Sequence, residues 1–180
     1  MENHLNNLFG PQINCYFDIS YNQDGTKVVD WGGEFNDNAD GSHTADQNNV
    51  VTEFGGLDES YNIHVFIIGK NGPLGNGNAA KGFTSPGERT VWIAGRPSDK
   101  ADFLETLGHE IGHVFLGGGH PDHLDPGLRG VVQLYGTDPS KRLMCSGEIF
   151  NSNSKLLVKA EWDKAEAWMS EEEKIRSMAP

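Results

Sequence analysis

The 180-residue sequence has few cysteines, few bases in its first third and no long apolar run. Cys15 and Cys145 are too few for a disulfide framework, and neither has the paired spacing of a structural zinc site. The longest apolar run, Val65 to Ile68, is far too short to span a bilayer. Met1 to Gly10 lacks the charged start and apolar stretch of a signal peptide. We therefore expect neither a disulfide scaffold nor an integral membrane protein, and we expect any secretion signal to have been removed or never to have existed.

Bases are scarcest in residues 1–66, which hold eleven Asp or Glu against one base, Lys27, in a chain of formal charge -12. An acidic surface repels phosphate backbones and anionic lipids, so we expect neither nucleic acid nor a membrane as a partner. Calcium or basic substrates fit the sign of the charge better, although such a charge also serves simply to keep a protein soluble.

Length and composition predict one loop-rich domain, residues 1–180, because the 23 glycines favour turns over long regular elements. The apolar spacing predicts an α+β fold with a small mixed twisted sheet, a helix that carries the segment HEIGH and a C-terminal helix. A short first helix should pass through Leu5 and Phe9 and stop at the breakers Gly10 and Pro11. The other expected elements are strands at 13–20, 62–69, 79–83 and 89–94, the second of them buried, and helices at about 99–116 and 154–169.

Residues 30–48 are rich in Asn, Asp and Gly, and we interpret them as a surface loop. Within them Asn36, Asn38, Asp40 and Gly41 resemble the start of a calcium-binding loop, but Gln47 stands where a bidentate glutamate is needed. An ordinary turn rich in Asx residues explains the segment better, and Ca²⁺ remains a second cofactor hypothesis.

The segment HEIGH, residues 109–113, carries the strongest chemical signal. His109 and His113 are four residues apart on the helix expected at 99–116, so both imidazoles project from one face within reach of one cation. Glu110 is rotated away around the helix and suits a general base better than a ligand. Exposed histidines also produce such a motif by chance, but the strongly periodic helix favours a zinc site.

Two later features extend this motif. Gly117 to Gly119 ends the helix abruptly, and His120 follows, where a third nitrogen can complete a three-ligand site that leaves one position open for water. Leu143 and Met144 come further along. Together these residues resemble the metzincin clan of zinc peptidases, whose pattern is HExxHxxGxxH followed by a tight methionine turn below the metal.

The resemblance covers about residues 62–170 and implies a zinc endopeptidase. It implies that His109, His113 and His120 bind Zn²⁺, that Glu110 is the base, and that Met144 packs beneath the metal. Glu110 would deprotonate a zinc-polarised water and then protonate the departing amine. Gly117 and His120 each fall one position later than in the metzincin pattern, and the three consecutive glycines can absorb the extra residue.

Alternatives remain open for the ligands and for the function. Asp122 and His123 compete with His120 as the third ligand, and a peptidase of another clan would use Glu161 or Glu166. A binding domain that keeps zinc without turnover is a further possibility. We interpret His4, His43 and His64 as surface or satisfied core residues.

By the same resemblance, residues 79–83 form the sheet edge along which a peptide or protein substrate adds itself as a strand. A plain edge strand is an equal interpretation. The strand that usually precedes the first helix is absent, which indicates a trimmed chain or a minimal domain. We expect a protein that is secreted or delivered outside the producing cell, and the sequence indicates no oligomeric state.

Overall fold

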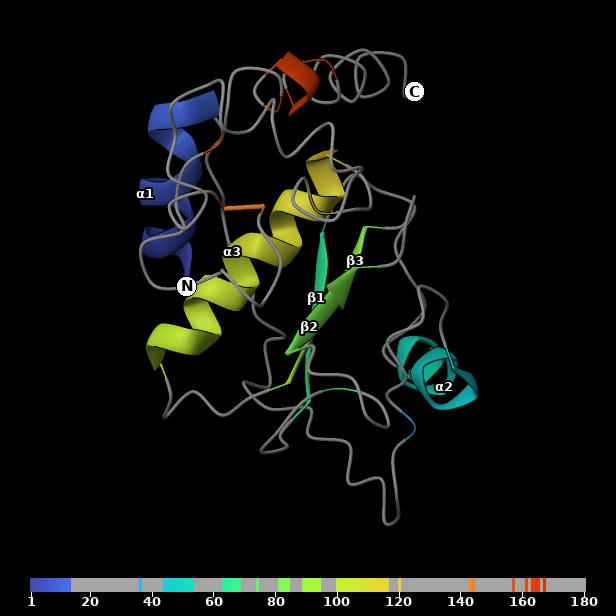
Figure 1. The fold of residues 1–180 in the computed structure, drawn as a ribbon. Coiled ribbons are helices and arrows are strands. Elements are labelled where there is room, and N and C mark those ends of the chain that lie inside the picture. The colour runs from blue at the N-terminus through green and yellow to red at the C-terminus, as the bar shows by residue number, and fades with distance from the viewer. Residues whose placement is uncertain are drawn as a thin grey trace, which may run out of the picture.

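The computed structural model describes residues 1–13, 36, 44–53, 63–68, 74, 81–84, 89–94, 100–116, 120, 143–144, 157, 161, 163–165 and 167. The helices in these ranges are α1 (Glu2–Ile13), α2 (Ala45–Glu53) and α3 (Lys100–Leu116), and the strands are β1 (His64–Ile68), β2 (Gly82–Thr84) and β3 (Thr90–Ala94). Figure 1 shows α1 on one side of α3, the sheet on the other, and α2 beyond the sheet. Within the described ranges, no helix is long and apolar enough to cross a membrane.

The three strands form a mixed sheet in the order β1-β3-β2, which confirms the expected small mixed sheet. β1 runs parallel to β3, and β2 runs antiparallel to it. Side chains of paired residues share a face of a sheet. Val91 and Ile93 therefore face α3 with their β2 partners Thr84 and Gly82, whereas Trp92 lies on the opposite face.

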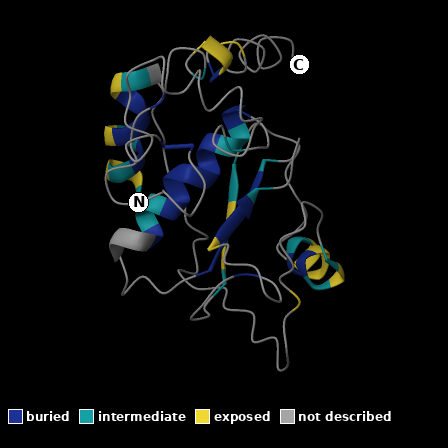
Figure 2. Cartoon of the chain, in the orientation of Figure 1, coloured by how far each residue is buried: buried dark blue, intermediate teal, exposed yellow. Residues whose placement is uncertain are grey.

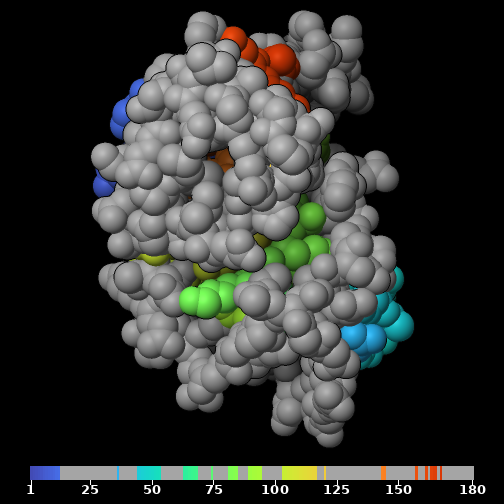
Figure 3. Space-filling view, viewed as in Figure 1, coloured from blue at the N-terminus to red at the C-terminus, as the bar shows by residue number. Residues whose placement is uncertain are grey.

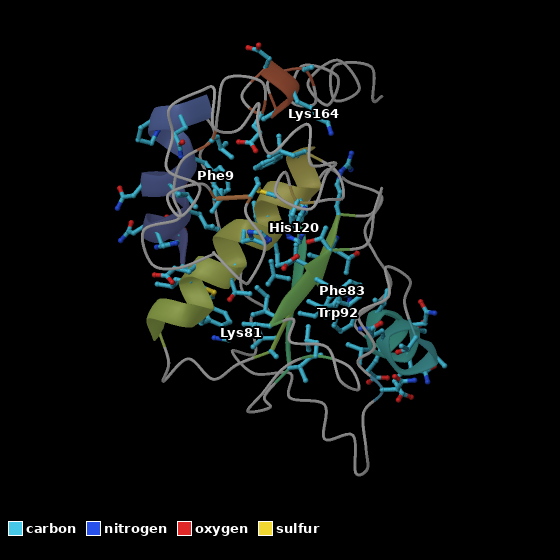
Figure 4. All side chains as sticks on the ribbon, in the orientation of Figure 1. Phe9, Lys81, Phe83, Trp92, His120 and Lys164 are labelled. Carbon is cyan, nitrogen blue, oxygen red and sulfur yellow. The ribbon has the colours of Figure 1, made fainter. Side chains whose placement is uncertain are left out.

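Helix α3 is the centre of the larger core, and most of its length is buried (Figure 2). It packs against β2 and β3 on one side and against α1 on the other. The ring of Phe9 on α1 meets that of Phe115 edge-on, with centroids 5.5 Å apart and an angle of 84° (Figure 4). The described core residues of this cluster are Leu5, Leu8, Phe9, Val91, Ile93, Phe103, Leu107, Ile111, Phe115, Leu116, Leu143, Met144, Leu157 and Ala165.

The smaller core lies between the other face of the sheet and α2. It contains Val50, Leu74, Phe83, Trp92 and Ala94. Phe83 and Trp92 point toward α2 in Figure 4. In the space-filling view atoms of α2 are exposed at the lower right edge, and atoms of the strand region are visible nearer the middle (Figure 3).

Helix α1 continues past Gly10 and Pro11 to Ile13, so the expectation that it stops at these breakers is wrong, and Ile13 does not begin a strand. Its last turn is stabilised from outside. The Gln12 side chain donates to the carbonyl of Leu8 at 2.7 Å and accepts from the backbone N–H of Leu157 at 2.8 Å. Residues 14–20 of the expected strand lie outside the described ranges.

Helix α2 corrects the last part of the surface loop expected at 30–48, because the helix begins at Ala45. Residues 30–35 and 37–43 of that loop lie outside the described ranges. Thr44 and Gln47 form a reciprocal capping box, in which the Gln47 N–H donates to the Thr44 hydroxyl at 3.1 Å and the Thr44 N–H donates to Gln47 Oε1 at 2.8 Å. The spacing Thr-x-x-Gln is a local signal that predicts this start. Gln47 is therefore a capping residue rather than a failed calcium ligand.

Strand β1 is only half buried, which corrects the expectation of a buried strand. Val65 and Ile67 are 37% and 44% exposed, because α3 packs mainly over β2 and β3. Phe66, on the opposite face, stacks on Trp92 with ring centroids 4.5 Å apart.

Part of the expected C-terminal helix falls within the described ranges. Residues 161, 163–165 and 167 are helical, but Leu157 is not, so a start at Ser154 is wrong. Lys164 donates to the carbonyl of Leu116 at the end of α3. A lysine that caps the last carbonyls of a helix is a common way to end it, and α3 ends before the three glycines as expected.

The capping box of α2 makes a stability prediction. Thr44→Ala removes the hydroxyl that accepts the Gln47 N–H, so we expect a loss of about 1 kcal/mol in the free energy of unfolding, measured by urea denaturation. Thr52→Ala is the matched control, because the exposed Thr52 hydroxyl only donates to the Asn48 carbonyl within the same helix. Equal stabilities of the two variants would contradict this role for Thr44.

Candidate metal centre

Three histidines converge on one point, two from the last turns of α3 and one from just beyond it. The Nε2 atoms of His109 and His113 are 3.2 Å apart, and those of His109 and His120 are 3.0 Å apart. The third separation, between His113 and His120, is 3.3 Å. His113 and His120 are half-buried and His109 is buried. Among the described residues, this group can hold a metal ion.

The orientation of His109 is set by the chain 34 residues later. Its Nδ1 lies 2.6 Å from the carbonyl oxygen of Leu143. A carbonyl only accepts, so Nδ1 must carry a proton, and in the neutral imidazole Nε2 then keeps its lone pair. Hydrogen bonds of this kind orient metal-binding histidines and raise their basicity. His109 is thus held in the tautomer that a metal needs.

Met144 packs against the part of α3 that carries His109 and His113. It forms a turn with Leu143 and is 1% exposed. A Cβ built at Gly112 would lie 2.5 Å from the Met144 sulfur, so a larger residue here would require the Met144 side chain to move. Gly112 lies between His109 and His113, so Met144 packs directly against the segment that carries both imidazoles.

The donor set fits a tetrahedral transition-metal ion. Zinc–nitrogen bonds of about 2.0–2.1 Å place neighbouring nitrogens of a tetrahedron roughly 3.3 Å apart. The three observed separations, 3.0, 3.2 and 3.3 Å, match this spacing closely. Imidazole nitrogens suit zinc, copper, iron and nickel rather than calcium or magnesium.

Glu110 turns from α3 toward β2, consistent with its expected rotation away from the histidine pair. Its side chain is 6% exposed. The hydroxyl of Thr84 lies 3.0 Å from Oε2 of Glu110 and 2.9 Å from its main-chain carbonyl oxygen. A Cβ built at Gly82 would lie 2.7 Å from Glu110 Cγ, so the carboxyl also packs tightly against the β2 backbone.

Burial governs the protonation of Glu110. Removal from water disfavours the carboxylate and raises the pKa of Glu110 from 4.5 to about 8, and the hydrogen bond with Thr84 lowers the pKa by less. Perturbed carboxyl groups of this kind are common at functional sites, although structural networks also produce them.

The candidates from the sequence therefore divide into three groups. His109, His113 and His120 come together, and Glu110 and Met144 lie beside the segment that holds the pair. Glu161 is not a member of the histidine group among the described residues. Three other candidates lie outside the described ranges: Asp122, His123 and Glu166. The same holds for Cys15, Cys145, His43, Asn38, Asp40 and Gly41.

His64 and Asn36, two polar residues outside the histidine group, lie in the described ranges. His64 is half-buried, and its Nε2 has no hydrogen-bond partner among the described residues. Asn36, at the start of the suspected calcium loop, makes local contacts instead: its N–H donates to Asp46 at 2.8 Å and its carbonyl accepts from Thr44 at 2.6 Å.

Three contributors to the site have no signal in the sequence motif. Thr84, Gly82 and the Leu143 carbonyl are distant from HEIGH along the chain, and their roles depend on contacts that the fold creates.

Comparisons with known proteins add no family to this picture. Protein-family models, curated proteins and solved structures were each searched, and none of them matches the chain.

The Gly112–Met144 contact can be tested by a double-mutant cycle. Glycine to alanine within a helix normally stabilises by about 1 kcal/mol. We expect Gly112→Ala to destabilise instead and to weaken metal binding, because the added Cβ displaces the Met144 sulfur. In a Met144→Ala background the same change should recover the ordinary gain. Unfolding free energies and equilibrium dialysis of zinc measure both effects, and additive behaviour of the two changes would contradict the contact.

The raised pKa of Glu110 predicts how the stability of the metal-free protein depends on pH. Between about 4.5 and about 8 the folded chain keeps a proton that the unfolded chain has released. The free energy of unfolding contributed by Glu110 is therefore complete below about pH 4.5 and is lost as the pH rises through about 8.

Glu110→Gln should lack this contribution. Urea denaturation of wild type and variant across this range, with a chelator present, measures the difference and cancels the titration of other groups. Parallel curves would contradict a buried Glu110 with a raised pKa.

Proposed function

We propose that the chain is a zinc-dependent endopeptidase of the metzincin type, in which His109, His113 and His120 hold Zn²⁺. The convergence of the three Nε2 atoms on one point carries the proposal. Catalytic zinc sites have three protein ligands and an open fourth position, whereas structural zinc sites are closed by four. Three imidazoles without a fourth ligand among the described residues favour the catalytic type.

In this proposal a zinc ion would act as a Lewis acid that lowers the pKa of water to about 7. Glu110 takes a proton from the water as the water oxygen attacks the scissile carbonyl carbon. It delivers that proton to the amide nitrogen as the carbon–nitrogen bond breaks. His109 contributes an oriented lone pair, which its hydrogen bond with the Leu143 carbonyl maintains. Two peptides leave, and no covalent intermediate with the chain forms.

The position of β2 supports a peptide substrate. β2 pairs with β3 on one side and is an outer strand of the described sheet. The Ala94 N–H donates to the Lys81 carbonyl, and hydrogen-bonded positions alternate along an antiparallel pair. The N–H and carbonyl groups of Gly82 and Thr84 consequently point to the outer edge, where an extended peptide can pair with them. Delivery outside the producing cell remains part of this proposal.

A non-catalytic zinc domain is the second candidate, and Glu110 argues against it. A buried carboxyl disfavours folding once it is ionised, and a purely structural zinc site has no use for it. A peptidase does have a use for such a group, because a base with a pKa near neutrality both accepts and returns a proton efficiently.

Three substitutions separate these functions. We expect zinc-loaded wild type to hold one ion per chain and to cleave a peptide library. Glu110→Gln should keep its zinc and lose about 10²- to 10⁴-fold in kcat, because only the base is removed. His120→Ala should lose both zinc and activity. Elemental analysis after dialysis and mass spectrometry of the products measure the two properties.

Glu161→Ala is the control, and it should match wild type in zinc content and in rate. A Glu110→Gln protein as active as wild type would refute the enzyme, and a zinc-replete, active His120→Ala protein would refute the ligand assignment.

A further inference from the structure

Thr84 on β2 makes contact with both ends of Glu110. Its hydroxyl oxygen lies 2.9 Å from the Glu110 main-chain carbonyl and 3.0 Å from the carboxyl oxygen Oε2. A glutamate side chain has three rotatable bonds, and its rotamers would otherwise scatter the carboxyl group. One hydroxyl that touches both the main chain and the carboxyl of the same residue limits all three bonds together. The contact therefore specifies where the carboxyl group lies relative to α3.

Gly82 limits the same carboxyl group from the other side. A Cβ at this position would lie 2.7 Å from Glu110 Cγ and 3.0 Å from Oε1. Gly82 and Thr84 are two residues apart in a strand and thus share the face that meets α3. The glycine leaves room for the Glu110 side chain, and the threonine supplies the polar partner. Gly82 and Thr84 of β2 therefore form a binding surface that matches the Glu110 side chain in shape and in polarity.

We propose that Thr84 is a positioning residue for the general base Glu110. This inference rests on the proposed peptidase function. A hydroxyl both donates and accepts, so it can donate to the carboxylate and accept from the carboxylic acid. The contact therefore persists while Glu110 takes up and returns a proton. Because the peptide of the proposed function pairs with the outer edge of β2, one strand would position both the base and the bond it acts on.

The test compares variants that differ in one hydroxyl group. Thr84→Val keeps the shape of the side chain and removes the hydroxyl, and Thr84→Ser keeps the hydroxyl. Thr90→Val is the matched control, because Thr90 is also a buried strand residue and no residue in the described part of the chain is a hydrogen-bond partner of its Oγ1. The zinc-loaded full chain is assayed on one peptide chosen from the library, and kcat, KM and zinc content are measured.

We expect Thr84→Val to lower kcat roughly 10- to 100-fold, the effect of losing a hydrogen bond to a charged group at a reacting centre. KM and zinc content should stay at the wild-type values. Thr84→Ser should recover kcat to within about 3-fold, and Thr90→Val should match wild type. Thr84→Ala is expected to show the same loss of kcat and replaces the valine variant if that one does not fold.

Two results would overturn the inference: a Thr84→Val protein with wild-type kcat, or a Thr84→Ser protein as slow as Thr84→Val. A wild-type protein that shows no Glu110-dependent hydrolysis would instead refute the proposed function. Crystal structures of wild type and Thr84→Val then report on the contact alone. A Glu110 carboxyl that is displaced in Thr84→Val supports the positioning role of Thr84, and a carboxyl in the same place as in wild type overturns it.

Discussion

Helix α3 fills the core and carries buried polar groups at the same time. The segments packed around it must therefore supply hydrogen-bond partners for these groups. His109 and Glu110 are only 7% and 6% exposed, although they follow one another in the middle of the apolar packing. A buried polar group without a partner costs free energy, so each of them needs a partner from another part of the chain. The Leu143 carbonyl serves His109 and the Thr84 hydroxyl serves Glu110. At the candidate metal centre both of these buried side chains of α3 therefore have a hydrogen-bond partner.

Two glycines make these partnerships geometrically feasible. Gly112 admits the Met144 turn against α3, and Gly82 admits the Glu110 side chain against β2. A glycine inside a helix or a strand costs up to about 1 kcal/mol relative to alanine. Here that cost accompanies close packing that a larger residue would disturb, because the Met144 or Glu110 side chain would have to move. The candidate metal centre therefore depends on residues that have no functional groups of their own.

Local sequence rules failed where distant contacts outweighed them. Pro11 predicts the end of α1, yet the helix continues to Ile13, because Gln12 is bound to Leu157, 145 residues further along. β1 looks like a buried strand in its composition, but α3 covers mainly its neighbours. The opposite error occurred at α2, where a sufficient local signal, the capping box that begins with Thr44, was overlooked among turn-forming residues.

The sequence by itself determined what depends on neighbours a few residues apart: the extent of α3, the shared direction of His109 and His113, and the rotation of Glu110 away from them. Helical geometry dictates these features wherever the helix forms. It left the third ligand open between His120 and its competitors, because the path of a chain beyond three glycines has no periodicity to follow. Only the tertiary structure brings the His120 imidazole beside those of His109 and His113 and the Thr84 hydroxyl beside Glu110, since such contacts exist only after distant segments pack together.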